Sequence, residues 1–578
     1  MSFTSRTKVR LLLSLLVILT FVSAFTISFA SRGVSRASGP AAITYKGVAS
    51  TVTRSAASKF VLRSTASPGV GRIRVTPVFH KQSASNAASA VGKNAPYVAD
   101  SGGGNSAGNL LHNFNGLNSV DSFNVNGFIL EPPDQGLCVG NLLGSKVTSE
   151  IINDVVAFYK PNGTLFGPLE NLNVFFGEPA TLNTSDPRCL YDPTTQSWFF
   201  SIVVYTNTLI PNHTDVLVLQ PNLLTAVYQI DTTLPNNTAG GCPCFGDQPK
   251  LGIDKNNVYI SVDQFGGPGL ALETGADLFA LSKSQLVAGA SVVNIAEFLN
   301  LSLAGIGITA LQPAITNSNS NIEYLLNSFP YADETQLLPN SISKLLGLWA
   351  LSNTAAVSTG GVPTLSETTI TSQIYAFPVP ALTTNGLSLA TYTNDSRMQQ
   401  VQFINGHLWG ALDSALFVGS DPVARDGAAW FELQPQVSNG TVTGAQFTDQ
   451  GFVAVAGKYL VYPAITTTYE GTTGISFSIT SPTFNPSTGY VVRKSGSANF
   501  GNAHLTSLGS GPDIGFACAS GFPQQCRWGD YSWSTLDPNG QDLWMAAEKT
   551  VNQVATQPGT TPPAQTNWGT QVWEVMGN

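Results

Sequence analysis

Charged side chains are scarce in this sequence. Asp, Glu, Lys and Arg make up 11% of its 578 residues, against roughly a quarter in ordinary soluble domains. Ser, Thr, Asn, Gln and Gly must therefore supply most of the polar surface. Helical patterning is also scarce, because the best helix candidates from residue 108 onward are the short segments 283–289 and 341–348. Short β-branched and aromatic runs between Gly, Pro, Asn and Asp clusters instead predict an all-β chain.

The usual catalytic and nucleotide-binding motifs are missing. There is no His-Glu-x-x-His, no P-loop, no nucleophile elbow between a predicted strand and helix, and no dinucleotide glycine fingerprint opening a helix. The sequence therefore names no reaction. Any catalytic group has to come from residues that the fold brings together.

The first thirty residues have the anatomy of a signal peptide. Arg6, Lys8 and Arg10 precede the apolar stretch 11–25, and small residues at 22–24 or 28–30 offer cleavage sites. An uncleaved N-terminal anchor is the alternative. No later stretch is long and apolar enough to span a bilayer, so we expect a secreted protein without a transmembrane helix after cleavage.

The charges divide the remaining chain into two parts. Residues 31–107 are rich in Ser, Ala and Gly and carry ten Lys or Arg but one acid, whereas 108–578 carry fourteen Lys or Arg and thirty-four Asp or Glu. We interpret 31–107 as a basic linker that is solvated, grips an anionic polymer or folds back on the body. The acidic body, 108–578, excludes nucleic acid as the main partner, because phosphates require a cationic face.

Six cysteines in an exported chain predict disulfides. Cys518 and Cys526 lie close enough in sequence to close a loop, and Cys138 and Cys189 lie at the starts of two successive repeats. Cys242 and Cys244 are separated by one proline, which indicates a labile pair. A zinc site at these two cysteines would need a second pair of ligands that the neighbouring sequence does not offer.

An internal repeat identifies the architecture. Each unit has a short polar motif, often X-Pro, then a strand, a polar turn and a second strand. The units begin near residues 133, 186, 248, 312, 400, 462 and 531. A four-stranded sheet cannot bury both faces alone, so we predict a seven-bladed β-propeller with a solenoid as the alternative. Each X-Pro element should open the innermost strand, and 108–130 should supply the strand that closes the ring. We expect a monomer.

Several segments resemble a group of exported bacterial propeller proteins. Residues 131–140 resemble a PPDxxGxVG start, 185–198 a DPxxxYDPxxxRW element and 246–252 a GDYPKLG element, and 527–532 match RWGDYS. The element around Arg397 departs from the family's Arg-rich strand, which puts a role for that blade in doubt. Over roughly 110–578 the resemblance implies a propeller and no particular chemistry.

The residues at the start of the innermost strands should surround one mouth of the central channel, where a ligand would bind. The candidate ligand-binding residues are Asp134, Arg188, Gln248, Lys250, Arg397, Arg527 and Tyr531. The candidate catalytic carboxylates are Asp186, Asp247 and Asp530. Calcium could bind near Asp134, Asp247 and Asp530. In the alternative, structural interpretation, these Asp side chains accept backbone N–H bonds from a neighbouring blade.

Three functions remain open. The first is a propeller that binds an extracellular glycan or cell-wall polymer at its channel mouth. The second is a polysaccharide hydrolase or lyase, which needs two carboxylates about 5 to 9.5 Å apart in an open pocket. The third is a structural surface or adhesion protein, favoured by a plugged channel.

Overall fold

The computed structural model describes residues 42–60, 74–75, 110–270, 272–303, 306–329, 342–384, 389–519, 524–559 and 562–577, all within the compact unit Ala41–Asn578. The predicted signal peptide and most of the basic segment lie outside the described residues. Within the described ranges, no helix combines the length and the apolar character that a membrane crossing requires.

Most of the described strands form antiparallel meanders. Each meander has four strands, and strands that are consecutive in it are neighbours in the sheet. The first contains β6 (Gly136–Leu142), β7 (Ser145–Ile151), β8 (Val155–Tyr159) and β9 (Glu170–Asn171). The second contains β10 (Asn183–Asp192), β11 (Ser197–Tyr205), β12 (Asn212–Leu219) and β13 (Leu224–Asp231). The third contains β14 (Phe245–Ile253), β15 (Asn257–Gly266), β16 (Leu272–Ser282) and β17 (Val292–Leu303).

The remaining meanders follow the same plan. The fourth contains β19 (Gln312–Pro313), β21 (Ile322–Ser328), β22 (Ile342–Ser352) and β23 (Thr364–Ala376). The fifth contains β26 (Met398–Ile404), β27 (His407–Leu416), β28 (Arg425–Ser438) and β29 (Thr441–Val453). The sixth contains β30 (Tyr459–Thr467), β31 (Thr473–Ser481), β32 (Phe484–Arg493) and β33 (His504–Ser507).

The last meander joins the two ends of the body. It contains β36 (Trp533–Leu536), β37 (Leu543–Gln557) and β38 (Ala564–Val575), and its fourth strand is β4 (Leu110–Asn118), which pairs antiparallel with β38. Segments more than 400 residues apart in the sequence therefore share one sheet, which fixes the C-terminal strands to the start of the body.

The first strands of successive meanders contact one another in a closed circuit. The order is β6, β10, β14, β19, β26, β30 and β36, and β36 contacts β6. The short strand β20 (Ile315–Thr316) pairs in parallel with both β14 and β26, so these first strands run in the same direction. A closed circuit of first strands, each followed by further strands of its own sheet, defines a β-propeller-like all-β fold.

The strands are buried on both faces because each sheet packs between two others. Every residue of β11 is buried, as is every residue of β15. Trp198, Phe158 and Phe200 fill one of the clusters between sheets. This packing explains why the sequence shows continuous apolar runs in place of strict alternation.

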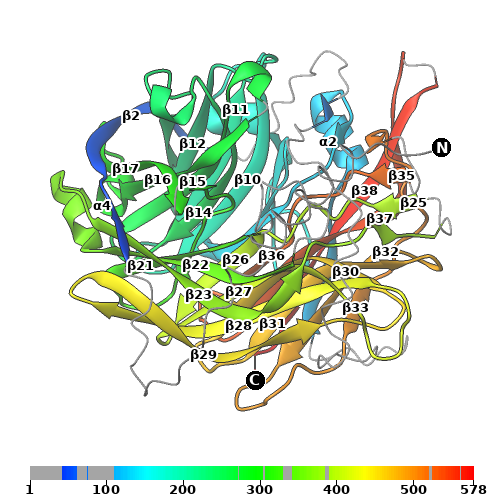
Figure 1. The fold of residues 1–578 in the computed structure, drawn as a ribbon. Coiled ribbons are helices and arrows are strands. Elements are labelled where there is room, and N and C mark those ends of the chain that lie inside the picture. Colours follow the sequence, from blue (N-terminus) through cyan, green and yellow to red (C-terminus); the bar gives the residue numbers. More distant parts are fainter. Residues whose placement is uncertain are drawn as a thin grey trace, which may run out of the picture. The chain divides into compact units, whose positions relative to one another are not determined.

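Two strands of the basic segment pair with the outer edges of the meanders. β1 (Ile43–Tyr45) pairs with β23, and β2 (Val48–Lys59) pairs with both β13 and β17. Figure 1 shows β2, in blue, beside β17. The Ser/Ala/Gly-rich composition of this segment has no sustained strand periodicity, so nothing in the sequence indicated these strands. Most side chains of β2 are exposed, and a strand held mainly by backbone pairing needs no apolar pattern.

The smaller elements lie between these strands. The helices are α2 (Ser119–Asn126), α3 (Leu172–Phe176) and α4 (Lys283–Val287), with single turns η2 (Thr238–Gly240), η3 (Pro268–Leu270) and η4 (Thr354–Thr359). The short strands are β3 (Arg74–Val75), β5 (Leu130–Glu131), β18 (Ile306–Gly307), β24 (Ala381–Leu382), β25 (Leu389–Thr391), β34 (Cys518–Ala519) and β35 (Gln524–Cys526).

One of the two helix candidates is wrong. Residues 283–287 form α4, but 342–352 form the strand β22. Leu346, Leu348 and Trp349 are fully buried there, between sheets. The apolar run is short enough to suit either element, and packing between two sheets decides for the strand.

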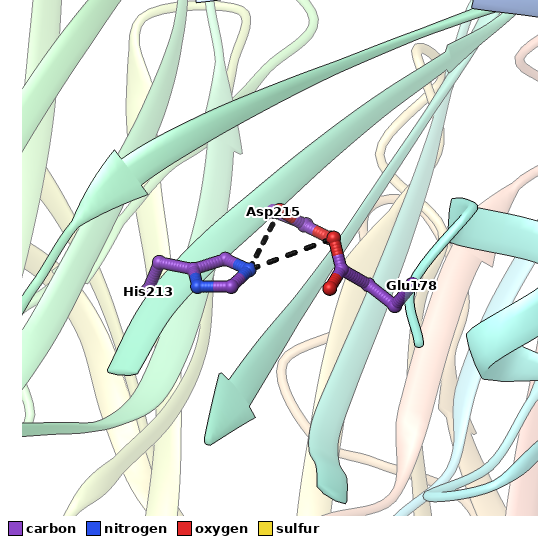
Figure 2. Close-up of side chains that lie close together, drawn as sticks. All are labelled: Glu178, His213 and Asp215. Carbon is purple, nitrogen blue, oxygen red and sulfur yellow. Dashed lines mark ion pairs between the residues drawn. The ribbon is translucent and has the colours of Figure 1, made fainter. Parts of the chain in front are cut away.

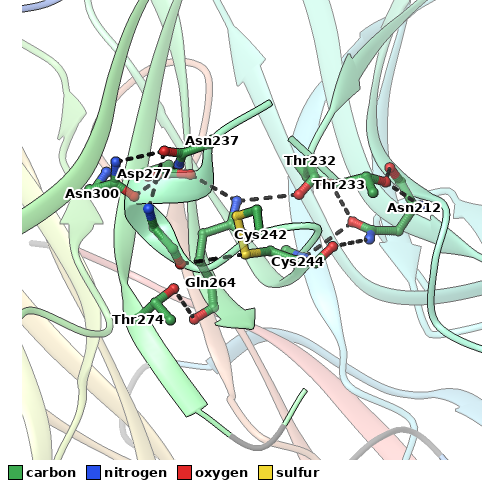
Figure 3. Close-up of a disulfide and its surroundings, with 12 residues drawn as sticks. Asn212, Thr232, Thr233, Asn237, Cys242, Cys244, Gln264, Thr274, Asp277 and Asn300 are labelled. Atoms are coloured by element: carbon green, nitrogen blue, oxygen red, sulfur yellow. Dashed lines mark hydrogen bonds between the residues drawn. A yellow bond between two sulfur atoms is a disulfide. The ribbon is translucent and has the colours of Figure 1, made fainter. Parts of the chain in front are cut away.

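The six cysteines form three pairs. Cys138 bonds to Cys189 and joins the first strands of the first two meanders, and Cys518 bonds to Cys526. Cys242 bonds to Cys244, so neither thiolate is free to bind a metal. Figure 3 shows the surroundings of this last pair, where Asn212 Nδ2 donates to the Cys244 carbonyl at 2.7 Å. The Cys244 N–H donates to the Thr233 carbonyl at 2.8 Å. The start of β12 and the segment after β13 therefore both bind Cys244 and hold the tight loop in place.

Candidate functional site

The X-Pro motifs form β-bulges inside the first strands. The register of β10 shifts between Ser185 and Arg188, and the register of β14 shifts between Asp247 and Lys250. The prediction that each X-Pro element opens its strand is therefore wrong for these strands. A bulge also leaves a residue out of the ladder, so proline, which has no N–H, is tolerated there as well as at a strand's first residue.

The bulge residues adopt left-handed backbone conformations. Asp186 has φ 54°, Gln248 has φ 46° and Tyr462 has φ 56°. Non-glycine residues visit this region at a cost of roughly 1–3 kcal/mol, so the surrounding structure must hold them there.

Hydrogen bonds from a neighbouring meander hold these segments. In each case a backbone N–H near the start of a first strand donates to a buried side-chain oxygen: Asp186 to Asn153 at 2.7 Å, Gly246 to Asn212 at 3.1 Å, Ala310 to Asp263 at 2.8 Å, Tyr462 to Asp413 at 3.0 Å and Asp530 to Asp134 at 2.7 Å. At Asp186 and Tyr462 the bond satisfies a donor that the bulge removes from the ladder. Asp134 has the role that the structural interpretation assigns to it.

The side chains at the start of the first strands converge in one buried group, which we call the arginine–carboxylate cluster: Asp134, Asp186, Arg188, Gln248, Arg397, Arg527, Asp530 and Tyr531. One oxygen from each of Asp134, Asp186 and Asp530 lies within 4.8 Å of the others. Gln248 Nε2 donates to Asp530 Oδ2 at 2.8 Å, and Arg527 Nη2 lies 3.4 Å from Asp530 Oδ1. Four meanders thus contribute to these contacts.

Two of the predicted ligand-binding residues, Lys250 and Arg397, are held by partners. Lys250 Nζ forms a 2.7 Å ion pair with Asp263 and donates to the Gln248 carbonyl at 3.2 Å. Arg397 binds Asp395 through Nε and Nη2, each at 2.8 Å, and its Nη1 donates to Gln248 Oε1. A guanidinium held by a fork of two bonds has few donors left for a ligand.

Arg188 is held differently from Arg397. Its guanidinium lies over the Tyr531 ring, 3.0 Å from the ring centroid. Nε and Nη1 are buried without a hydrogen-bond partner among the described residues, as are both amide atoms of Gln135. Buried donors without partners are uncommon, so Arg188 has unused capacity for a polar group.

Burial raises the pKa values of three carboxyls in and beside the cluster. The pKa of Asp186 rises to about 8, through burial first and then the negative charges of Asp247 and Asp530. The pKa of Asp247 rises to about 7, through burial first and then Asp263 and Asp530. Burial likewise raises the pKa of Asp134 well above its usual value.

Calcium does not fit the cluster well. Asp134 already accepts bonds from the Asp530 N–H and from Asn153 Nδ2, the latter at 2.7 Å. Arg188 and Arg527 bring two positive charges to the same group. Ca²⁺ needs six to eight oxygen ligands, so internal charge balance explains these carboxylates better.

The opposite end of the first strands carries an open hollow, which was not among the predicted sites. Its wide part has a volume of about 370 Å³ and is lined by Tyr191, Asp192, Lys255, Lys283, Asn317, Asn319 and Tyr469, among others. A narrower part of about 30 Å³ is lined by Val139, Leu190, Ile315, Gln402, Thr466 and Thr535. These six residues come from six different meanders, which places the narrow part on the axis of the circuit. We call the whole the tyrosine hollow.

The two tyrosines of the hollow rest on glycines. The ring of Tyr191 lies over Gly140, and the ring of Tyr469 lies over Gly540; a Cβ at either glycine would overlap the ring. Tyr469 is 47% exposed. The hollow therefore presents an aromatic face to solvent, which suits the apolar C–H face of a sugar ring.

Polar groups surround these rings. Lys283 forms a 2.9 Å ion pair with Asp192, whereas Lys255 Nζ donates to the neutral amide oxygen of Asn319 at 3.0 Å. Asn317 accepts a 2.8 Å bond from Gln402. Ligand sites are typically preformed concavities that contain a small number of well-placed polar groups. The sequence signal for this site is the polar turn after each first strand.

No protein-family model matches the sequence, and no curated protein matches it. Among solved structures, a sialidase from Trypanosoma rangeli in complex with sialic acid is 10% identical with a TM-score of 0.34, and the match covers 74% of this chain and 57% of the sialidase chain. The Dos1 propeller is 6% identical with a TM-score of 0.32 and coverages of 75% and 76%. A thermostable family-43 glycoside hydrolase is 10% identical with a TM-score of 0.25 and coverages of 68% and 89%. The chain is distantly similar to these proteins, and its own strand circuit makes it a β-propeller-like protein.

Proposed function

We propose that this protein is an exported seven-bladed β-propeller that binds an extracellular glycan or a similar hydroxyl-rich surface polymer in the tyrosine hollow. Each meander would be one blade. The charged start and apolar stretch of residues 1–30 support export, and three disulfides are typical of an oxidising compartment.

The observation that carries this proposal is the tyrosine hollow itself. It combines an exposed aromatic ring, Tyr469, with amide, hydroxyl and ammonium groups in a volume of about 370 Å³. Lys255 forms its hydrogen bond with a neutral partner, Asn319, so a sugar carboxylate or sulfate is a suitable ligand group there.

Hydrolysis at Asp186, Asp247 and Asp530 has less support. All three residues are buried, and the nearest oxygens of Asp186 and Asp530 lie within 4.8 Å of each other. A glycosidase needs carboxylates about 5 to 9.5 Å apart that the substrate can reach. A second ligand site at the arginine–carboxylate cluster is favoured by one feature, the unpartnered donors of Arg188 and Gln135.

The test is retention of the mature protein on a broad glycan array and on whole cells. We expect retention by the wild type and at least tenfold weaker retention by Tyr469→Ala, because the variant loses the aromatic face. Leu508→Ala, which removes an exposed side chain outside the hollow, should bind like the wild type. Failure of the wild type to bind any probe would overturn the binding proposal, and unchanged binding by Tyr469→Ala would move the site elsewhere.

Two glycines allow an effect on ligand binding to be distinguished from an effect on folding stability. Gly540 has φ 72°, and a Cβ there would overlap Tyr469; Gly406 has φ 82°, with no atom within 4 Å of its Cβ position. Gly540→Ala and Gly406→Ala should each cost about 1 kcal/mol of the free energy of unfolding. We expect only Gly540→Ala to weaken glycan retention. Equal retention by both variants would contradict the role of the Tyr469 ring.

A further inference from the structure

Three metal-binding side chains converge away from the axis, on the third strand of the second meander. His213 and Asp215 lie two residues apart on β12, so both side chains project from the same face of the sheet. Glu178 follows α3 and approaches the same face. Figure 2 shows the three side chains pointing toward one another.

The distances between the donor atoms suit a small cation. His213 Nε2 lies 3.4 Å from Asp215 Oδ1 and 3.7 Å from Glu178 Oε1, and the three donor atoms all lie within 4.8 Å of one another. Ligands bound to Zn²⁺ at 2.0–2.2 Å in a tetrahedron stand about 3.4 Å apart. The separations therefore need little adjustment.

Asp215 supplies the independent sign of a missing partner. It is completely buried, and neither of its carboxylate oxygens has a hydrogen bond among the described residues. Its ion-pair contact is His213 at 3.4 Å, and a buried carboxylate without hydrogen bonds is costly. A second carboxylate, Glu178, lies beside it with 6% of its side chain exposed, so two acidic groups share one mostly buried space.

The neighbouring residue Gln229 positions the group. It pairs with Asp215 across β12 and β13, and its Nε2 donates to Glu178 Oε1 at 2.6 Å; the same Nε2 lies 3.2 Å from His213 Nε2, so this amide must turn aside when an ion binds. A bond of this kind to a ligand carboxylate is typical of the surroundings of metal sites. The side chain of His213 is 22% exposed, which leaves a route for an ion from solvent.

We propose that Glu178, His213 and Asp215 form a site for Zn²⁺ or a similar divalent transition ion. One imidazole and two carboxylates match the nitrogen and oxygen donors that zinc accepts, whereas calcium and magnesium favour oxygen alone. The ion would neutralise the two carboxylates and tie the segment after α3 to β12. Water can complete the coordination. The site is independent of the glycan proposal.

The test is zinc stoichiometry. The full-length mature protein is stripped with EDTA, loaded with ZnCl₂, desalted and measured by inductively coupled plasma mass spectrometry. The wild type should retain one zinc per chain, and zinc should raise its Tm. His213→Gln and Glu178→Gln should bind zinc at least tenfold more weakly, with no rise in Tm.

His407 provides a matched control. It is also half-buried beside a carboxylate and a glutamine, with Nδ1 2.8 Å from Glu432 and Nε2 3.0 Å from Gln434, but Arg493 already neutralises that carboxylate at 2.7 Å. His407→Gln should therefore retain zinc like the wild type. The proposal is overturned if the wild type retains no zinc. That result would mean that the two carboxylates are balanced by a proton on His213 and not by a metal ion. Equal zinc retention by His213→Gln and the wild type would overturn it too.

Discussion

The buried carboxyls near the axis tie the stability of this protein to pH. Asp186 is 3% exposed, and its pKa of about 8 lies well above the usual value of 3.8. The native state therefore keeps a proton that the unfolded chain releases above about pH 4. Stability from this residue is complete at low pH and is lost as pH rises toward 8.

We expect the free energy of unfolding to fall by about 3.5 kcal/mol between pH 5 and pH 8 through Asp186 alone. Asp186→Asn should flatten that part of the profile, because an amide does not titrate. The measurement is guanidinium unfolding at pH 5, 6.5 and 8, with Asp231→Asn as the exposed control. An unchanged slope in Asp186→Asn would show that Asp186 is charged throughout this range.

At the scale of elements, β2 protects two open edges. β13 and β17 are the outer strands of the second and third meanders, and both pair with β2. An uncovered outer strand is a template for pairing with another chain. The basic segment thus contributes to the sheets, although most of its side chains face solvent.

A proline in β2 should uncover β17. Thr51 is exposed and pairs with Asn294, and Thr51→Pro removes a backbone donor from the ladder. We expect backbone amides of residues 292–297 to exchange with deuterium at least tenfold faster, while those of β31 stay unchanged. Thr51→Val keeps the strand and its β-branched side chain, so it should exchange like the wild type. Equal exchange in the two variants would mean that β17 does not depend on β2.

At the scale of the whole molecule, closure depends on contacts between distant segments. β4 pairs with β38, and the disulfide between Cys138 and Cys189 joins the first two meanders. That disulfide spans 51 residues, whereas Cys518 and Cys526 are 8 apart. A longer closed loop restricts the unfolded chain more.

Removing the two disulfides should therefore have unequal effects. The double variant Cys138→Ala with Cys189→Ala should lose about 4 kcal/mol of the free energy of unfolding, and Cys518→Ala with Cys526→Ala about 2.5 kcal/mol. Thermal and chemical unfolding of both variants would measure this. A larger loss from the shorter loop would contradict the loop-entropy explanation.

The sequence was informative where local rules apply. The repeated polar motif, strand and turn predicted the first two strands of each meander, because strand periodicity and turn chemistry act over a few residues. Residues 108–130 were expected to supply the last strand, and 110–118 form β4. The strands β1 and β2 were missed because backbone pairing at an edge leaves no apolar pattern to detect.

The sequence by itself determined the all-β class, the succession of strands and which polar residues lie in or next to the first strands. Only the tertiary structure decided that Asp134, Asp186 and Asp530 are buried in one cluster, that the open hollow lies at the other end, and that Glu178 meets His213 and Asp215. Burial and proximity depend on contacts between residues far apart in the chain, such as Asp134 with Asp530. Local sequence patterns do not reveal such contacts. The pattern of a segment reflects its own strand, whereas the side chains around it come from other meanders.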